Sequence, residues 1–176
     1  MKIVWLSGFA GAGKDTVASI LVKKYDYHRV AFADHLKDFT AELYGFDRAL
    51  CDKEEGKKTV VHDGKTVRDL LIKESADAKT KNVHIFAEQA LITMLETKKE
   101  LIVISDWRYP HEYEYITGVL PLAQHTTIRI TRPNLPSLQI PSEHALDSWL
   151  FDCEIVNTNL HTLEKDVLKY LNKRPI

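Results

Sequence analysis

The chain has 176 residues, a length that suits one compact domain with a sizeable core. Apolar residues make up 44% and charged residues 28%, as in ordinary globular proteins, and the formal net charge of -1 gives no overall field for holding nucleic acid. Because the sequence shows no signal-peptide pattern and no apolar stretch long enough to span a bilayer, we expect a cytosolic protein with neither a nucleic-acid nor a membrane partner.

The first third of the chain predicts alternating strands and helices. Residues 2–7 are a short apolar run typical of a buried strand, and a glycine-rich loop separates them from a predicted helix over 15–25. A second strand is predicted over 28–33, and Asp34 is expected to cap a helix that ends at Gly45. The polar stretch 46–65 predicts a mobile connection.

The middle of the chain carries clear helix starts and a central strand. Thr66 is expected to cap a helix, with Asp69 completing a variant of the capping box, and Asn82 is expected to cap the next helix to about Thr97. The continuous apolar run over 101–105 predicts a parallel strand that is covered on both faces.

The last third repeats the alternation. Pro110 predicts the first residue of a helix that ends at Gly118, and a strand is predicted over 126–131. The proline-containing segment 134–141 predicts a loop or lid. The remaining predicted elements are a short helix over 142–151, a strand over 153–157 and an amphipathic helix over 160–171.

This alternation predicts an α/β fold with a parallel sheet and helices on both faces. Ligands bind at the carboxyl ends of the strands in such sheets. Asp34, Asp106 and Arg132 each lie just past a predicted strand, so we expect them to face one crevice. The cysteines Cys51 and Cys153 lack CxxC spacing and are expected to be free thiols.

The glycine-rich loop has the spacing of a P-loop, Gly8-x4-Gly13-Lys14, between an apolar strand and an amphipathic helix. Glycine lets the backbone N–H groups turn inward around a phosphate, and the helix N-terminus adds positive potential. Lys14 is expected to bridge the β- and γ-phosphates of a nucleoside triphosphate. The residues expected to hold the triphosphate are Gly8, Ala10, Gly11, Ala12, Gly13, Lys14, Asp15 and Thr16. A dinucleotide site is less well matched, because Thr16 stands where its third glycine would be.

The metal position of this loop departs from the usual pattern. A hydroxyl residue normally follows the lysine and binds Mg²⁺, but here Asp15 does, with Thr16 next. Either Asp15 holds the metal through water or Thr16 takes the role. Asp106, at the end of the central strand, is a further candidate for Mg²⁺ or its water shell, and a loop cap is its plainer alternative.

Several side chains are candidates for a phosphorylated acceptor. Arg108 and Arg132 are planar donors suited to bidentate phosphate contacts, although each alone is more often a surface ion pair. The other candidates are Arg68 in the first turn of its helix, Asp34 and Lys37 one turn apart, and Glu143-His144 after the proline segment. Asp34 could orient the attacking group or simply cap its helix. The histidines have no metal-ligand spacing.

Together these residues resemble the deoxynucleoside monophosphate kinases of the P-loop kinase superfamily, which are best known from bacteriophages. The resemblance covers nearly the whole chain in order. It rests on the loop ending Lys14-Asp15-Thr16, on Ala33-Asp34-x-Leu36-Lys37, Thr66-Val67-Arg68-Asp69-Leu70-Leu71, Ser105-Asp106-Trp107-Arg108-Tyr109-Pro110-His111-Glu112, Arg129-x-x-Arg132-Pro133, Ser142-Glu143-x-x-Leu146-Asp147, Asp152 and Asn157.

The resemblance implies that ATP and Mg²⁺ convert a deoxynucleoside monophosphate to the diphosphate. It implies that Lys14 holds ATP and that Arg132 is a lid arginine at the transferred group. Arg68, Arg108 and Lys37 would contact the acceptor phosphate, while Asp34 and Asp106 would organise acceptor and metal. It further implies one P-loop kinase domain over 1–176, with an acceptor-side, mobile region at about 46–82 and a lid at about 132–147.

A second departure affects base preference. After Leu70-Leu71 such proteins often continue with glutamine, glycine and a basic residue, but this chain has Ile72-Lys73-Glu74-Ser75, and Lys79 or Lys81 would have to supply the charge. Trp107 or Tyr44 is a candidate to exclude a 2′-hydroxyl. The oligomeric state, including a homodimer, stays open. Two other functions remain as alternatives: a P-loop kinase for another small acceptor, such as phosphomevalonate or dephospho-coenzyme A, and a non-catalytic ATP-binding module.

Overall fold

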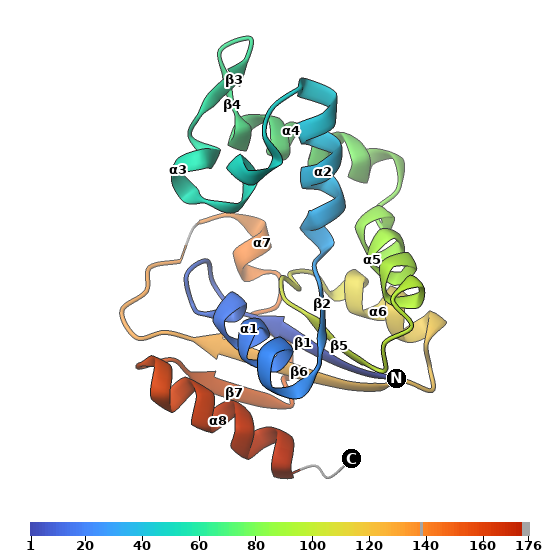
Figure 1. Ribbon diagram of the computed structural model, residues 1–176, viewed down its shortest axis with the longest axis vertical. Coiled ribbons are helices and arrows are strands. Elements are labelled where there is room, and N and C mark those ends of the chain that lie inside the picture. The colour runs from blue at the N-terminus through green and yellow to red at the C-terminus, as the bar shows by residue number, and fades with distance from the viewer. Residues whose placement is uncertain (138, 174–176) are drawn as a thin grey trace. The chain divides into compact units, whose positions relative to one another are not determined.

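The computed structural model describes residues 1–137 and 139–173 (Figure 1). Within the predicted lid segment, Leu138 lies outside the described residues. The chain forms two compact units: the first comprises Met1–Ala31 and the chain from Leu91 onward, and the second comprises Phe32–Ala90. Among the described residues, none of the helices combines the length and the apolarity needed to cross a bilayer.

The first unit contains a five-stranded parallel sheet, as the alternation of elements predicts. In spatial order its strands are β2 (His28–Val30), β5 (Leu101–Ile104), β1 (Lys2–Ser7), β6 (Gln124–Thr131) and β7 (Cys153–Val156). The helices of this unit are α1 (Lys14–Tyr25), α6 (Pro110–Val119), α7 (Pro141–His144) and α8 (Leu160–Lys173), and α5 (Ile85–Glu96) crosses the border between the units. The α/β prediction is therefore confirmed.

The central strand β1 is buried on both faces, which explains its continuous apolar run. Val4 and Leu6 belong to the core shared with α1 and α8, which cover the same face of the sheet (Figure 1). Trp5 points to the opposite face, where its ring lies 5.0 Å from that of Tyr113 in α6 and 5.6 Å from that of Trp107. Helices on both faces therefore fix β1, whose carboxyl end leads into the glycine-rich loop.

Helix α6 starts as its proline predicts. Pro110 is in the first turn, and the carboxylate of Glu112 accepts hydrogen bonds from the backbone N–H groups of Arg108 and Tyr109, both at 3.0 Å. The helix runs one residue beyond Gly118. Because Glu112 is buried, its two bonds fix the turn that carries Arg108 away from the end of β5.

The second unit has more regular structure than the sequence predicts. Its elements are α2 (Phe32–Tyr44), the 3₁₀ helix η1 (Arg48–Asp52), α3 (Glu54–Lys57), the antiparallel strands β3 (Val60–His62) and β4 (Lys65–Thr66), and α4 (Val67–Lys81). The stretch predicted as a connection thus holds two short helices and a hairpin. Asp47 caps η1 through the N–H of Ala49, and Asp63 and Gly64 turn the hairpin with φ of 45° and 73°.

Three helix boundaries differ from the prediction. Helix α2 begins at Phe32, so Asp34 lies in its first turn and is not its cap. Asn82 ends α4, and its side chain accepts from the N–H of His84 just before α5. Helix α7 is only four residues long, and the chain then continues in turns.

The cap of α4 gives a first stability prediction. The Thr66 hydroxyl accepts from the N–H of Asp69 at 3.2 Å, and the Asp69 carboxylate accepts from the N–H of Thr66 at 2.9 Å, a complete capping box. Thr66→Ala removes one side of this pair and should lower the free energy of unfolding by about 1 kcal/mol. Urea unfolding measures the change. Thr66→Ser keeps the hydroxyl and serves as control; equal losses in both variants would contradict the capping role.

Candidate functional site

The glycine-rich loop has the backbone geometry of an anion-binding loop. Gly8, Gly11 and Gly13 have φ of 141°, 79° and 112°, values that favour glycine. Gly13 is the N-cap of α1 and provides no side-chain cap, so the first N–H groups of the helix are offered to a ligand. The loop can therefore surround a phosphate, as its sequence predicts.

Two close approaches seat this loop on the sheet. A Cβ atom at Gly8 would lie 2.1 Å from the carbonyl oxygen of Ile130 in β6. A Cβ atom at Gly13 would lie 2.5 Å from Nδ2 of Asn157, and this same amide donates to the carbonyl of Ala12 at 2.8 Å. Asn157 enters the sequence argument only through the family resemblance, and the structure makes it a support of the loop.

Lys14 turns its ammonium group into the loop. Its Nζ donates to the carbonyl oxygens of Gly8 at 2.6 Å and Phe9 at 3.0 Å, and only 9% of the residue is exposed. Burial, and next the charge of Arg108, hold the pKa of Lys14 below its ordinary value. Three carboxylates act to raise this pKa, those of Glu143, Asp15 and Asp106. The predicted donor-site lysine thus lies among the predicted metal and acceptor residues of this unit.

Two arginines and a glutamate complete this cluster. Arg108 Nη1 donates to Glu143 Oε1 at 2.8 Å, and the second oxygen of Glu143 accepts from the N–H of Ala10 at 2.9 Å. Arg132 Nη1 donates to the carbonyl of Gly11 at 3.5 Å. Arg108 and Arg132 are predicted from strand ends and Glu143 from the proline segment. The structure brings Arg132 and Glu143 onto one loop, with Arg108 bound to Glu143.

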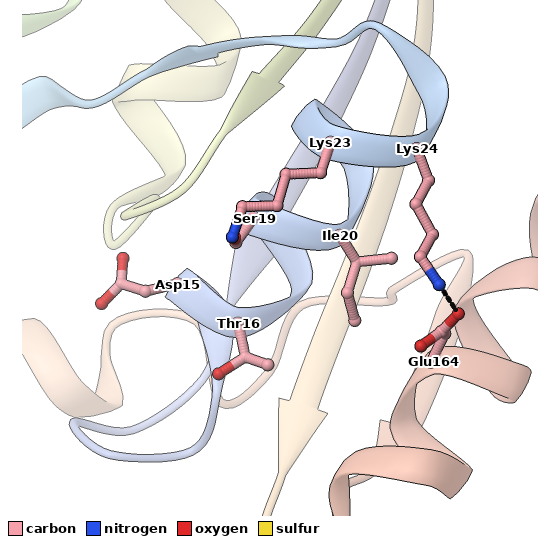
Figure 2. Close-up of a pocket in the computed structure, with 7 residues that line it drawn as sticks. All are labelled: Asp15, Thr16, Ser19, Ile20, Lys23, Lys24 and Glu164. Atoms are coloured by element: carbon pink, nitrogen blue, oxygen red, sulfur yellow. Dashed lines mark hydrogen bonds and ion pairs between the residues drawn. The ribbon is translucent and has the colours of Figure 1, made fainter.

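A depression of about 470 Å³ adjoins the site along α1. It is lined by Asp15, Thr16, Ser19, Ile20, Lys23, Lys24 and Glu164. Figure 2 shows Asp15 and Thr16 at the loop end of the helix, and Lys24 in an ion pair with Glu164 of α8. Within the described residues, no group of three or more His, Cys, Asp or Glu side chains is arranged to hold a metal ion by itself.

The predicted acceptor residues of the second unit lie in an ionic network. Lys37 Nζ lies 3.7 Å from Asp34 Oδ1, as the one-turn spacing of these two residues on α2 allows. It also lies 3.0 Å from Asp52 Oδ1. Arg48 pairs with Asp34 at 3.6 Å and also with Asp38 and Asp52. Arg48 was not predicted from the sequence, although its i,i+4 spacing to Asp52 was an available signal.

Arg68 is paired as well. Its guanidinium donates to the carboxylate of Glu54 in α3, an ion pair within the second unit. The three predicted acceptor contacts of this unit, Asp34, Lys37 and Arg68, are therefore each held by a neighbouring charge of their own unit.

Of the two aromatic predictions, that for Trp107 needs correction, and that for Tyr44 stays a prediction. Trp107 is 1% exposed and packs against Trp149 and Phe151, with ring centroids 5.0 and 5.7 Å away. Its side chain is part of the core and does not line a sugar site. Tyr44 donates its hydroxyl to Glu74 at 2.6 Å, and this bond is the main cause that raises the pKa of Tyr44. Cys51 and Cys153 are free thiols, as predicted.

Comparisons with known proteins agree with this architecture. No protein-family model matches the chain. A protein of Acanthamoeba polyphaga mimivirus named "Putative deoxynucleotide monophosphate kinase" is 29% identical over 185 aligned positions, which cover 94% of this chain and 92% of the relative.

Two solved structures resemble the whole chain. TT1252 from Thermus thermophilus is 18% identical with a TM-score of 0.54, covering 99% of this chain and 98% of that one. Dephospho-CoA kinase from Campylobacter jejuni is 13% identical with a TM-score of 0.51, covering 98% and 96%. At these identities the likeness shows the fold alone, which this chain shares with both solved structures.

Proposed function

We propose that the chain transfers the γ-phosphoryl group of ATP to a deoxynucleoside 5′-monophosphate. The observation that carries the proposal is the cluster at the glycine-rich loop, where Lys14 and the guanidinium groups of Arg108 and Arg132 lie around one anion-binding backbone. The viral relative supports the choice of acceptor, because its name gives that activity and the two chains match over nearly their full lengths.

The donor half of the reaction belongs to the first unit. The N–H groups of the loop and of the start of α1 bind the β- and γ-phosphates, and Lys14 neutralises the charge that develops on them. Burial strengthens this charge–charge interaction, because water screens it less. Arg132 assists at the transferred group. Phosphoryl transfer needs little covalent help, so these positioned charges supply the catalysis.

The acceptor half requires groups that bind a second phosphate. The family resemblance assigns contact with the acceptor phosphate to Arg108, Lys37 and Arg68. Asp34 orients the acceptor. These roles come from the family resemblance, and within the second unit Lys37 pairs with Asp52 and Arg68 pairs with Glu54.

Magnesium fits the donor set of this site. Asp15 and Asp106 both exert their charge on Lys14, and Thr16 follows in the same turn as Asp15. Carboxylate and hydroxyl oxygens suit Mg²⁺, which takes only one or two protein ligands where phosphates and waters supply the rest. Asp106, with Asp15 or Thr16, would hold the ion, and when bound it would neutralise phosphate charge.

A panel of acceptors tests the proposal. ADP formation from ATP and Mg²⁺ is measured by a coupled assay with each deoxynucleoside and ribonucleoside monophosphate, with dephospho-coenzyme A and with phosphomevalonate. The proposal expects turnover with at least one deoxynucleotide well above the acceptor-free background. Turnover with dephospho-coenzyme A or phosphomevalonate alone would assign a different kinase. Binding of ATP with no acceptor-dependent ADP would indicate a non-catalytic module.

A further inference from the structure

Glu143 accepts hydrogen bonds from two donors of the proposed phosphate site. Its carboxylate lies on the short helix α7 and its side chain is only 1% exposed. Oε2 accepts from the N–H of Ala10 in the glycine-rich loop at 2.9 Å, and Oε1 accepts from Arg108 Nη1 at 2.8 Å. Arg108 Nη1 also lies 3.5 Å from the hydroxyl of Ser142. A buried anion is thus bound where the loop presents its N–H groups.

A second set of contacts holds α7 on the same loop. The ring of Phe9, the neighbour of Ala10, lies 5.5 Å from the imidazole of His144 and 5.5 Å from the guanidinium of Arg129. Asp147 joins these two groups, accepting from Arg129 Nη2 at 2.6 Å and lying 2.7 Å from His144 Nδ1. The helix that carries Glu143 is therefore attached to the loop through two adjacent loop residues.

The bonding of Glu143 matches that of a bound phosphate oxygen. Both are anionic acceptors, and both are recognised by backbone N–H groups and by arginine. The charge of Glu143 also acts on Lys14, where it opposes the effect of burial on the pKa. A phosphate at Ala10 would meet this carboxylate at close range, and two buried like charges repel each other strongly.

We propose that Glu143 is a resident anion of the unliganded protein, and that a phosphate group of the incoming ligand displaces it from Ala10 and Arg108. The proposal rests on the proposed function in one respect, namely that the loop binds a triphosphate. Displacement frees Arg108 for a phosphate and detaches α7 from the loop. Before binding, Glu143 satisfies the N–H of Ala10 and pairs with the half-buried Arg108, and leaving such donors without a partner costs free energy.

The consequence is a competition that binding measurements detect. The affinity for inorganic tripolyphosphate is lowered by the bonds that Glu143 must give up. Glu143→Ala removes the competing anion, and Glu143→Gln keeps the side-chain shape but removes its charge. We expect both variants to bind tripolyphosphate about ten-fold more tightly than the unchanged protein, which corresponds to about 1.4 kcal/mol.

Calorimetric titration with tripolyphosphate and with ATP provides the affinities. Glu74→Gln is the matched control, because Glu74 is also a buried glutamate that accepts two hydrogen bonds, from the Tyr44 hydroxyl and from Lys73 Nζ. Hydrogen exchange at the Ala10 amide is the second readout. It should be slow in the unliganded protein, faster in both Glu143 variants, and unchanged in Glu74→Gln.

The outcomes separate this proposal from the function on which it rests. If the unchanged protein binds tripolyphosphate and the Glu143 variants bind it equally or more weakly, the resident anion is refuted, while the kinase proposal stands. A loss of turnover at unchanged affinity would instead make Glu143 a residue that positions Arg108. If neither the unchanged protein nor any variant binds ATP or tripolyphosphate, the proposed function itself fails.

Discussion

The variant Lys14→Ala should turn over at least about 10³-fold more slowly than the unchanged protein while keeping its fold. The reason is that Lys14 brings a buried positive charge to the loop that would hold the β- and γ-phosphates, held there by the carbonyl oxygens of Gly8 and Phe9. Steady-state ADP formation with the best acceptor of the panel measures the loss. Lys23→Ala is the matched control, because Lys23 is an exposed lysine on the same helix.

The stability of Lys14→Ala follows from the pKa of the lysine. Burial lowers this pKa below its ordinary value of 10.5, so the charged side chain carries a cost in the folded protein. That cost is fully present at neutral pH and is relieved as the pH rises through the lowered pKa toward 10.5. Its removal offsets the two lost hydrogen bonds, and we expect the free energy of unfolding at pH 7 to change by less than about 1 kcal/mol. Retained activity would refute the role given to Lys14, and an unfolded variant would contradict the expected stability.

The second large effect is expected at Gly8. A methyl group there would lie 2.1 Å from the carbonyl oxygen of Ile130, at a φ of 141° that is costly for any other residue. Because the obstacle is backbone of the strand β6, it has no rotamer by which to move aside. We expect Gly8→Ala to lower the free energy of unfolding by roughly 2–4 kcal/mol and to abolish nucleotide binding.

Gly118→Ala is the control for Gly8→Ala. Gly118 lies inside α6, and a Cβ atom there would meet no atom within 4 Å. Alanine is the better helix former, so this variant should be more stable by about 0.5–1 kcal/mol. Thermal and urea unfolding compare the two variants. A Gly8→Ala protein as stable as Gly118→Ala would show that the loop can shift away from β6.

The parts of the fold that could be predicted are those with local signals. The apolar run of β5, the P-loop glycines, Pro110 and the Thr66–Asp69 pair each specify their element within a few residues, and the structure confirms all four. The polar composition of 46–65 predicts a connection without regular structure, whereas this stretch holds two short helices and a hairpin. The caps and positive-φ turn that order this stretch are short patterns, which are common in connections that form no helix or hairpin.

The details of the site could not be predicted, because they depend on residues far apart in the chain. The bond from Ala10 to Glu143 spans 133 positions, and nothing near either residue indicates it. The burial of Trp107 has the same cause, since its partners Trp149 and Phe151 arrive from a later segment. The spacing of Arg48 and Asp52 indicates a pair on one helix, but the further contacts of Arg48 with Asp34 and Asp38 need the fold of the second unit.

The central position of β1 determines when the loop can form during protein synthesis. Lys2 lies opposite Leu101 on one side and Gln124 on the other, so the first strand leaves the ribosome long before either of its neighbours. Bringing strands so far apart in the chain together costs conformational entropy, and only the completed strand pairing compensates for this cost. Gly8 is seated on Ile130 and Ala12 is held by Asn157, both of which follow later still. A nascent chain can therefore complete its phosphate loop only after Asn157 has been synthesised, so the finished loop is not available to nucleotide before that point.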